Sequence, residues 1–155
     1  MNNNKKQKSL VRHDGTGLFW QFVKLCLEIT EESKYTLKTQ ILKDFLESFT
    51  GDIYLLFKLL LPKQDKRVFR LQDKALVQVM SQVLGADHDD MLEHLDKGDA
   101  SETCKKFLIS CGMACKRGSV SLKQVDDFLD QLTTVTKRDE QAQIFEKFIP
   151  KLTGD

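Results

Sequence analysis

The chain has 155 residues, of which 41% are hydrophobic and 30% charged, and its formal net charge is +1. This length supports one domain with a real core and is too short for two, and the composition excludes wholesale disorder. The charges are segregated along the chain. The first thirteen residues hold four lysines or arginines and no acid, whereas residues 87–102 hold seven acids and one lysine. Such segregation is compatible with a polyanion-binding face and an acidic back.

The N-terminal residues differ from the rest of the chain. Residues 1–15 are polar and rich in lysine, and they show no hydrophobic periodicity. We predict a flexible basic tail here, followed by a helical domain over residues 16–155. The tail is either a basic arm that contacts nucleic acid or a solvated extension.

The N-terminus and the cysteines bear on the compartment. The chain starts with polar residues and has no apolar leader, and its four cysteines do not have the spacing of a zinc site. These features favour an intracellular protein with reduced thiols and no bound metal. Cys26 and Cys104 fall on apolar helical faces, so we expect both in the core.

Hydrophobic periodicity predicts helices in the first half of the chain. Apolar residues recur every three or four positions over residues 18–29 and again over residues 37–49. The stretch 51–62 is apolar on nearly every side except at Lys58, which is typical of a buried helix surrounded by other helices. Asp52 is expected to cap this helix and the proline at its end to stop it. At about ten residues it is too short to cross a bilayer, so no membrane partner is expected.

The second half of the chain predicts five more helices. A left-handed cap at Gly85 ends the first of these, and Asp87 caps the next, short one. Capping boxes begin the following two helices at Asp99 and Ser121. The last helix is expected to open at Thr136 and to stop at the second of the two prolines. No segment predicts a strand. The expected fold class is therefore all-α: a single compact domain of about eight helices around the buried central helix, without a sheet.

Groups that would form an active site are scarce. His88 and His94 are six residues apart, a spacing that does not bring them onto one helical face, and we expect both to face solvent. The chain contains no Gly-x-Ser-x-Gly nucleophile motif and no phosphate-binding loop of the Gly-x-x-x-x-Gly-Lys type. The acidic pairs at residues 89–90 and 126–127 are expected on exposed helix faces, as solubility and capping residues. We assign no catalytic and no metal-ligating residue.

Two basic clusters favour a binding function. One follows the central helix, and the other lies at the start of the last helix, where free backbone N–H groups add to the charge. Lysine and arginine bind phosphates through charge-assisted hydrogen bonds and release counterions from duplex DNA. For each cluster the alternative is an ordinary solvated face. No bidentate base reader is recognisable, so binding is expected to depend on shape and backbone. The candidate DNA-binding residues are Lys63, Lys66, Arg67, Arg70, Lys74, Thr136, Lys137 and Arg138.

Several runs of residues, in a fixed order, carry a family resemblance. They include Phe19-x-x-Phe22-x-x-Leu25-Cys26, Gly51-Asp52-Ile53-Tyr54-Leu55, Lys58-Leu59-Leu60-Leu61-Pro62, Gly98-Asp99 with Ser101-Glu102-Thr103, and Val125-Asp126-x-Phe128-Leu129. The Lys-Leu-Leu-Leu-Pro and Gly-Asp-x-x-Glu-Thr runs are specific. Over roughly residues 18–143 the chain resembles the N-terminal DNA-binding domain of ATP-dependent DNA ligases, of the animal DNA ligase III and poxvirus type.

The resemblance implies a helical domain that grips nicked duplex DNA through phosphates and the minor groove, in support of nick sealing in replication, repair and recombination. It implies two partner domains in the same ligase, an adenylation domain and an oligonucleotide-binding-fold domain. It also implies ATP and Mg²⁺ as cofactors of the full-length ligase, with none in this fragment. The implied location is nuclear or mitochondrial, or a cytoplasmic viral factory for a ligase of the poxvirus type.

The family's nucleotidyl lysine lies in a Lys-x-Asp-Gly motif, which this chain lacks. The nearest run, Lys137-Arg138-Asp139-Glu140, has no glycine. We therefore expect this fragment to be inactive alone. The family domain continues for several more helices, so the chain is expected to be an incomplete ligase N-terminal domain. The alternative function is a helical protein–protein docking module in a DNA-repair assembly, which would use the acidic face at residues 87–102.

Overall fold

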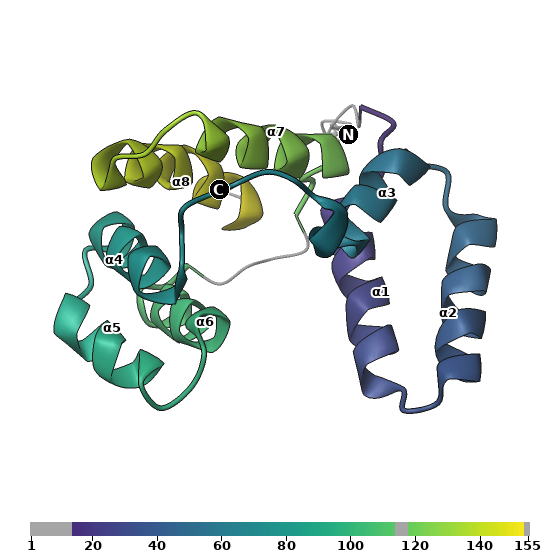
Figure 1. The fold of residues 1–155 in the computed structure, drawn as a ribbon, viewed down its shortest axis with the longest axis horizontal. Helices are drawn as coiled ribbons and strands as arrows, with labels where there is room; N and C mark the ends of the chain where they lie inside the picture. The colour runs from purple at the N-terminus through teal and green to yellow at the C-terminus, as the bar shows by residue number, and fades with distance from the viewer. Residues whose placement is uncertain (1–13, 114–117, 154–155) are drawn as a thin grey trace, which may run out of the picture.

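The computed structural model describes residues 14–113 and 118–153 (Figure 1). Over these residues the chain is helical, with a single isolated antiparallel bridge between Leu18 and Ser121, so the all-α prediction is confirmed. Most of the predicted tail of residues 1–15 lies outside the described residues. The elements are α1 (Phe19–Glu31), α2 (Tyr35–Ser48), α3 (Ile53–Leu60), the 3₁₀ helix η1 (Pro62–Gln64), α4 (Asp73–Leu84), α5 (His88–Leu95), α6 (Ala100–Ser110), α7 (Leu122–Thr133) and α8 (Arg138–Thr153).

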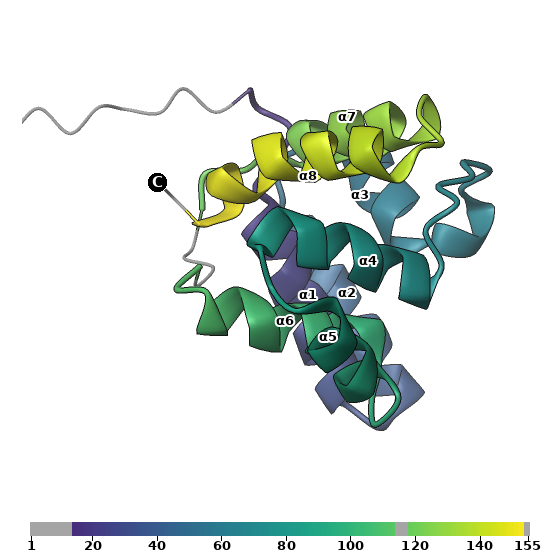
Figure 2. The same cartoon turned by 90° about the vertical axis from the view of Figure 1, so that its left-hand side faces the viewer.

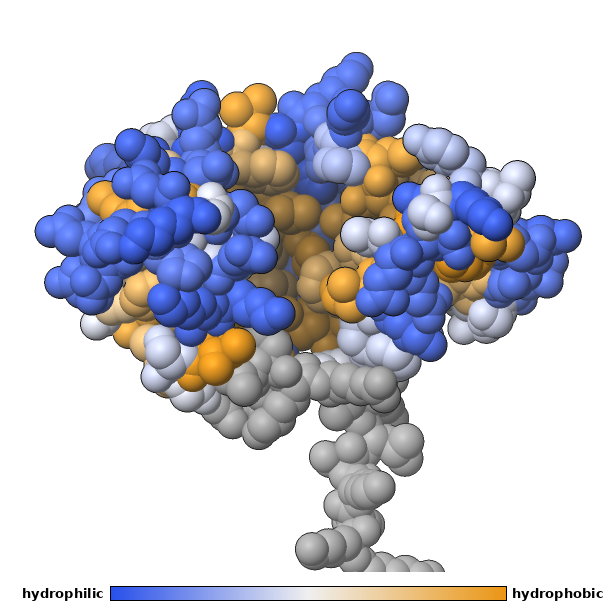
Figure 3. Space-filling view, turned by 90° about the horizontal axis from the view of Figure 1, so that it is seen from below, coloured by the Kyte–Doolittle hydropathy of each residue, from blue (hydrophilic) through white to orange (hydrophobic). Residues whose placement is uncertain are grey.

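The helices form two groups joined by α7 (Figure 1). The N-lobe consists of α1, α2 and α3, and the C-lobe consists of α4, α5, α6 and α8. α7 packs against α3 on one side and against α8 on the other. Figure 2 shows α7 and α8 as a layer over α4, with α5 and α6 beneath it. From below, Figure 3 shows a hollow between the two lobes that hydrophobic residues line. None of the described helices is long and apolar enough to span a membrane.

Three clusters of apolar side chains make up the core. The N-lobe cluster is built on Leu25, Leu55 and Leu56, together with Leu122 from α7. A third cluster lies between α7 and α8, where the ring of Phe128 stacks on that of Phe148 with centroids 4.2 Å apart. The buried members of the C-lobe cluster are Val77, Met80, Met91, Leu95, Ala100 and Ile149.

Helix caps form at all the predicted positions, but at Asp99 the side-chain cap forms without the reciprocal bond from Glu102 that a capping box requires. The carboxylates of Asp52, Asp87 and Asp99 accept hydrogen bonds from backbone N–H groups in the first turns of α3, α5 and α6. Ser121 forms the predicted reciprocal capping box of α7. Gly85 ends α4 in the left-handed region, with φ of 61°. Each cap satisfies backbone groups that the helix itself leaves unpaired.

Two expectations about helix ends were wrong. α8 begins at Arg138, two residues after the predicted start, and it continues through Pro150 to Thr153. A proline inside a helix removes one backbone hydrogen bond and crowds the carbonyl four residues before it, and in α8 only the last turn is affected. α4 begins at Asp73, which places Lys74 in its first turn.

The central apolar helix is buried on one side only. Leu55 and Leu56 of α3 are buried, as expected, but Ile53 is 52% and Tyr54 is 73% exposed. α3 packs in the N-lobe cluster and against α7, and no helix of the described residues covers its remaining side. The expectation of burial on every side was therefore wrong. The apolar pattern includes an exposed surface as well as a core.

The residues just before α1 connect the N-lobe to α7 through hydrogen bonds. The backbone N–H of Phe19 donates to Val120 O at 2.8 Å, and the N–H of Asp52 donates to Thr16 O at 2.9 Å. The hydroxyl of Ser121 donates to a carboxylate oxygen of Asp14 at 2.5 Å. The starts of α1, α3 and α7 are thus held together by backbone pairing and by two side-chain contacts, the second of which runs from the Lys123 N–H to the Thr16 hydroxyl.

Candidate nucleic-acid interface

The segment between α3 and α4, residues 61–72, crosses from the N-lobe to the C-lobe alongside α7 and α8 (Figure 1). We call it the connecting segment. Its second half is attached to α8 by side chains that bind its backbone. The amide of Gln141, which is fully buried, donates to Phe69 O at 3.2 Å. The guanidinium of Arg138 donates both to Arg70 O at 3.1 Å and to Gln141 Oε1 at 2.6 Å. The two predicted basic clusters therefore meet in space.

Most of the predicted DNA-binding residues lie along one edge of the molecule. In Figure 2 the connecting segment, the turn between α7 and α8 and the first turn of α4 all lie toward the right-hand side, and Figure 1, where that side faces the viewer, shows them spread from the end of α3 to the start of α8. The predicted residues on these elements are exposed to solvent, apart from Arg67 and Arg138, which are half-buried. We call the exposed set the basic edge; it consists of Lys63, Lys66, Arg70, Lys74, Thr136 and Lys137.

Acidic residues also lie on this edge. Asp73 occupies the first turn of α4, and Asp139 and Glu140 occupy the first turn of α8. Carboxylates at these positions stabilise the positive ends of the helix dipoles. The edge is therefore basic along the connecting segment and mixed in charge at the helix starts.

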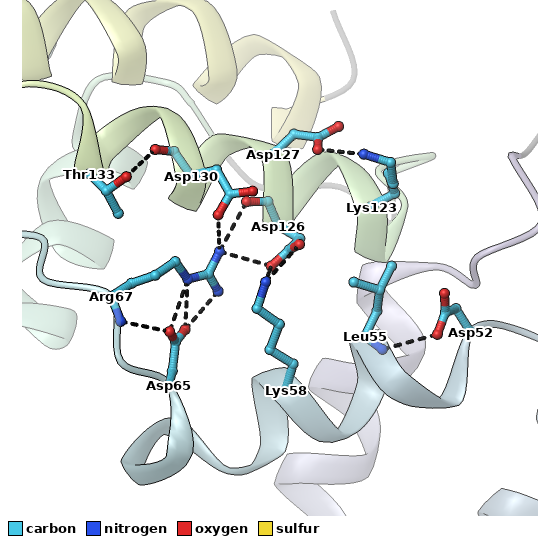
Figure 4. Close-up of polar contacts among 10 residues, drawn as sticks. All are labelled: Asp52, Leu55, Lys58, Asp65, Arg67, Lys123, Asp126, Asp127, Asp130 and Thr133. Carbon is cyan, nitrogen blue, oxygen red and sulfur yellow. Dashed lines mark hydrogen bonds and ion pairs between the residues drawn. The ribbon is translucent and has the colours of Figure 1, made fainter.

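Arg67 differs from the other predicted residues, because its side chain is only 13% exposed and points inward (Figure 4). Nε and Nη2 donate to the Asp65 carboxylate at 2.8 and 2.7 Å. Nη1 donates to Asp126 and to Asp130, at 2.8 Å in each case. Burial disfavours the charged guanidinium, but these carboxylates outweigh it and raise the pKa of Arg67. That Arg67 contacts DNA stays a prediction; its donors are already occupied by three carboxylates.

Asp126 lies at the centre of this group (Figure 4). It is 8% exposed and also accepts hydrogen bonds from Nζ of Lys58, with distances of 2.7 and 3.0 Å to its two oxygens. The expectation of an exposed acidic pair at residues 126–127 was therefore wrong for Asp126, because its face of α7 is covered by α3 and the connecting segment. A signal was present in the sequence. A lone lysine in an otherwise apolar helix needs a buried counter-ion.

We call these five residues the ion cluster: Lys58, Asp65, Arg67, Asp126 and Asp130. It joins α3, the connecting segment and α7. The hydrogen bond from Arg67, as the largest influence, lowers the pKa of Asp65. Asp65 is thus held in its ionised form.

A pocket of about 590 Å³ opens beside the ion cluster. Its apolar wall is formed by Tyr54, Phe57 and Leu61, and Lys66 lies at its polar side. Tyr54 and Leu61 are 73% and 50% exposed. An apolar surface therefore lies next to the basic edge, in an arrangement suited to a partner that is charged but not uniformly polar.

Comparison with known proteins places the chain in a family. The family model described as DNA ligase N terminus matches residues 18–155. The chain belongs to this family. The resemblance inferred from the sequence runs is thereby confirmed.

Three relatives show the range of this similarity. A DNA ligase 3 of Dictyostelium discoideum is 45% identical over 140 residues, which cover 90% of this chain and 12% of that protein. A DNA ligase of fowlpox virus is 32% identical over 139 residues, which cover 86% and 25%. A DNA ligase of vaccinia virus (strain Ankara) is 32% identical over 126 residues, which cover 80% and 23%. The chain spans a quarter or less of the length of each of these relatives.

Three of the seven acids in residues 87–102, the acidic segment, have structural roles in this ligase N-terminal domain. Asp87 and Asp99 cap helices, and Glu93 pairs with Lys97. His94 was expected to face solvent, and this was wrong. Its side chain is half-buried, with Nδ1 2.9 Å from the hydroxyl of Thr103. The segment belongs to α5 and its flanks, beneath α4 and remote from α7 (Figure 1). Among the described residues the side chain of Asp89, which is 97% exposed, makes only an ion pair with the neighbouring His88, with Nδ1 and Oδ1 3.8 Å apart.

The two cysteines that were expected in the core are only partly buried, and Cys111 is exposed. Cys26 and Cys104 are half-buried, and both have a raised pKa because burial disfavours the thiolate; that of Cys104 is raised to about 11. Cys104 packs against the C-lobe cluster. Within residues 14–113 and 118–153, no group of three or more His, Cys, Asp or Glu side chains is arranged to hold a metal ion.

Proposed function

We propose that this chain is a non-catalytic DNA-binding domain of an ATP-dependent DNA ligase, which holds nicked duplex DNA by its phosphates and minor groove. The observation that carries the proposal is the contact between Arg138 and the backbone of Arg70. It brings two basic clusters that are far apart in the sequence to one edge. Duplex DNA presents a dense row of phosphates, so an edge with cations from three segments suits it better than a short peptide.

We assign the phosphate contacts to the exposed side chains of Lys63, Lys66, Arg70, Lys74 and Lys137. Thr136 and the free backbone N–H groups at the start of α8 add donors of the kind that bind anions. Arg138 and Arg67 act from behind this surface, because their guanidinium groups bind the connecting segment and α7. Contacts of this kind position a duplex and carry no base preference.

Sealing of the nick falls to other parts of the parent protein. An adenylation domain and an oligonucleotide-binding-fold domain would supply it, with ATP and Mg²⁺ as cofactors. In this chain the run closest to the nucleotidyl-lysine motif begins α8, where Arg138 is engaged with Gln141. The parent would act wherever DNA is replicated or repaired, in the nucleus, in mitochondria or in a viral factory.

The test is binding of a fluorescent nicked duplex, with an intact duplex alongside, over a salt series. The variant Lys63→Glu/Lys66→Glu removes two cations of the basic edge. The matched control, Lys105→Glu/Lys106→Glu, makes the same charge change on α6, at exposed residues of the C-lobe. We expect binding to weaken steeply with salt, and the slope of log K against log salt to drop by about one for each lost phosphate contact.

The control variant should keep the wild-type slope. Equal losses in the two variants would mean that net charge alone governs binding, which contradicts the assigned surface. Absence of binding at low salt would contradict the proposal itself and favour the docking module, which would act through the acidic segment. Replacing Asp89 and Asp90 by lysine would then abolish capture of the protein partner.

A further inference from the structure

The ion cluster is built differently from the other ion pairs of the described residues. Its contacts join Lys58 of α3 and Arg67 of the connecting segment to Asp126 of α7, residues far apart in the chain. Five other ion pairs each join residues at most four positions apart. Short-range pairs on a helix surface contribute little to stability or shape. The long-range pairs, by contrast, fix where the connecting segment runs.

We propose that Asp126 is a positioning residue for DNA binding: it holds Arg67 and Lys58 so that the two halves of the basic edge face the same duplex. This inference rests on the proposed function. Asp126 does not touch DNA in this account. It acts through the path of the connecting segment, which carries Lys63 before the two cluster residues Asp65 and Arg67, Lys66 between them and Arg70 after them.

The charges of the cluster exclude the simpler role of a phosphate site. Two cations, Lys58 and Arg67, are matched against three carboxylates. A group with an excess of negative charge does not attract phosphate. The cations of the connecting segment that are exposed to solvent are therefore those outside the cluster: Lys63, Lys66 and Arg70.

The far end of the connecting segment is also held in a defined conformation. Arg70 has a φ of 52°, in the left-handed region that residues other than glycine rarely adopt. Such a conformation persists only where surrounding contacts determine it. Here the backbone carbonyls of Phe69 and Arg70 are bound by Gln141 and Arg138. With the ion cluster at one end and these hydrogen bonds at the other, the segment has one path across the lobes.

For the substitution Asp126→Asn, the positioning role and a purely electrostatic effect predict opposite changes in DNA affinity. Asp126→Asn removes a negative charge near a polyanion, so an electrostatic effect alone would tighten DNA binding. Loss of positioning would weaken it. Asp127→Asn is the matched control, since it makes the same charge change on the same helix at a side chain that is 48% exposed and pairs with Lys123.

The experiment measures binding of the fluorescent nicked duplex to the 155-residue chain and to both variants, at temperatures well below unfolding. We expect Asp126→Asn to bind on the order of tenfold more weakly at about 0.1 M salt, as expected when one or two phosphate contacts are lost. Its salt slope should fall accordingly. Asp127→Asn should bind as the wild type does or slightly more tightly.

Amide hydrogen exchange provides a second measurement that a general loss of stability would not reproduce. Exchange over residues 65–70 should accelerate in Asp126→Asn while α4 and α8 keep wild-type protection. Uniform acceleration across all helices would overturn the positioning role. Should Asp126→Asn fail to fold, Asp65→Asn weakens the same cluster from the connecting segment and should shift binding and exchange in the same directions.

The two proposals fail in different ways. If the wild type binds with a steep salt dependence and Asp126→Asn binds as tightly as Asp127→Asn, the positioning role is wrong and the DNA-binding function stands. If the wild type does not bind DNA at low salt, the function is wrong, and the positioning role falls with it. Both proposals are supported if Asp126→Asn binds DNA more weakly while Asp127→Asn does not, and if amide exchange in Asp126→Asn accelerates only over residues 65–70.

Discussion

The two lobes of this domain are stabilised in different ways. All four helices of the C-lobe contribute buried apolar residues to one cluster. In the N-lobe, only α1 and α3 contribute fully buried residues, and α2 contributes none. The N-lobe also needs Leu122 of α7 to complete its cluster. The C-lobe thus has a core of its own, whereas the N-lobe depends on α7.

The exposed apolar residues follow the same division. Large hydrophobic side chains that face solvent are concentrated in the N-lobe, where they include Leu27, Tyr35 and Tyr54, while in the C-lobe Ile109 is the example. A lobe that buries little apolar surface gains less from packing. Its position is then set by directed polar contacts, which here are the ion cluster and the backbone pairing of residues 16–19.

The largest expected difference between the lobes lies in their cores. Met91→Ala, at a fully buried position of the C-lobe, should lower the free energy of unfolding by about 2–5 kcal/mol. Leu37→Ala on α2, at a side chain that is 45% exposed, should lower it by less than about 1 kcal/mol. Urea denaturation of the two variants measures both values. Equal losses would mean that α2 is as firmly packed as the C-lobe helices.

The next effect comes from the ion cluster. Arg67→Met leaves Asp65 and Asp126 without their guanidinium partner, and should lower the free energy of unfolding by about 2 kcal/mol, less than for a fully buried pair because the side chains retain some exposure. Lys123→Met, which breaks the exposed pair with Asp127, is the control and should leave the stability unchanged. Thermal unfolding followed by circular dichroism distinguishes the two. A similar midpoint for both variants would show that the cluster contributes no more than a surface pair.

Features set by neighbouring residues were predictable from the sequence. The caps at Asp52, Asp87 and Ser121 depend on side chains within three residues of the backbone groups that they bind, and all form as expected. The helical periodicity likewise identified every α-helix. The ends of α8 were misjudged because proline and threonine are only statistical markers of helix termini.

Features set by the packing of distant segments were not predictable. Asp126 and Asp127 are adjacent acids with the same local sequence signal, yet only Asp126 is covered by another element. Arg67 lies in a basic run and resembles its neighbours in sequence, but its partners on α7 are about sixty positions away. The meeting of Arg70 with Arg138 depends on where α8 lies. Composition and spacing carry no information about the position of α8. They therefore indicated the two basic clusters but not that the clusters lie next to each other.

A smaller effect is expected where the N-lobe and α7 share a cap. Ser121→Ala removes the hydrogen bond to the backbone N–H of Gln124 and the contact with Asp14. Loss of an N-cap serine costs typically about 1 kcal/mol in free energy of unfolding. Ser110→Ala, at an exposed serine at the end of α6, is the control and should have almost no effect. If urea denaturation gives the same result for both, the side-chain hydrogen bonds of Ser121 do not contribute to stability.

The smallest expected effect is a dependence of the free energy of unfolding on pH, which arises from the ion cluster. The pKa of Asp65 is lowered below its ordinary value of 3.8, chiefly by the hydrogen bond from Arg67. A carboxylate with a lowered pKa in the folded state stabilises the fold above its unfolded pKa, and this contribution is lost as the pH falls through the folded pKa. The stability difference between the wild type and Arg67→Met should therefore be constant from about pH 5 to 8 and shrink below about pH 4.

Thermal midpoints of both proteins over this pH range measure that difference. Asp99 of the C-lobe also has a lowered pKa, chiefly because Ser101 donates to it, but it is present in both proteins and cancels. The remaining difference isolates the link between the connecting segment and α7. A difference that persists unchanged to pH 2 would show that Arg67 stabilises the fold by packing rather than by its charge. The N-lobe would then be held, like the C-lobe, by burial of apolar surface.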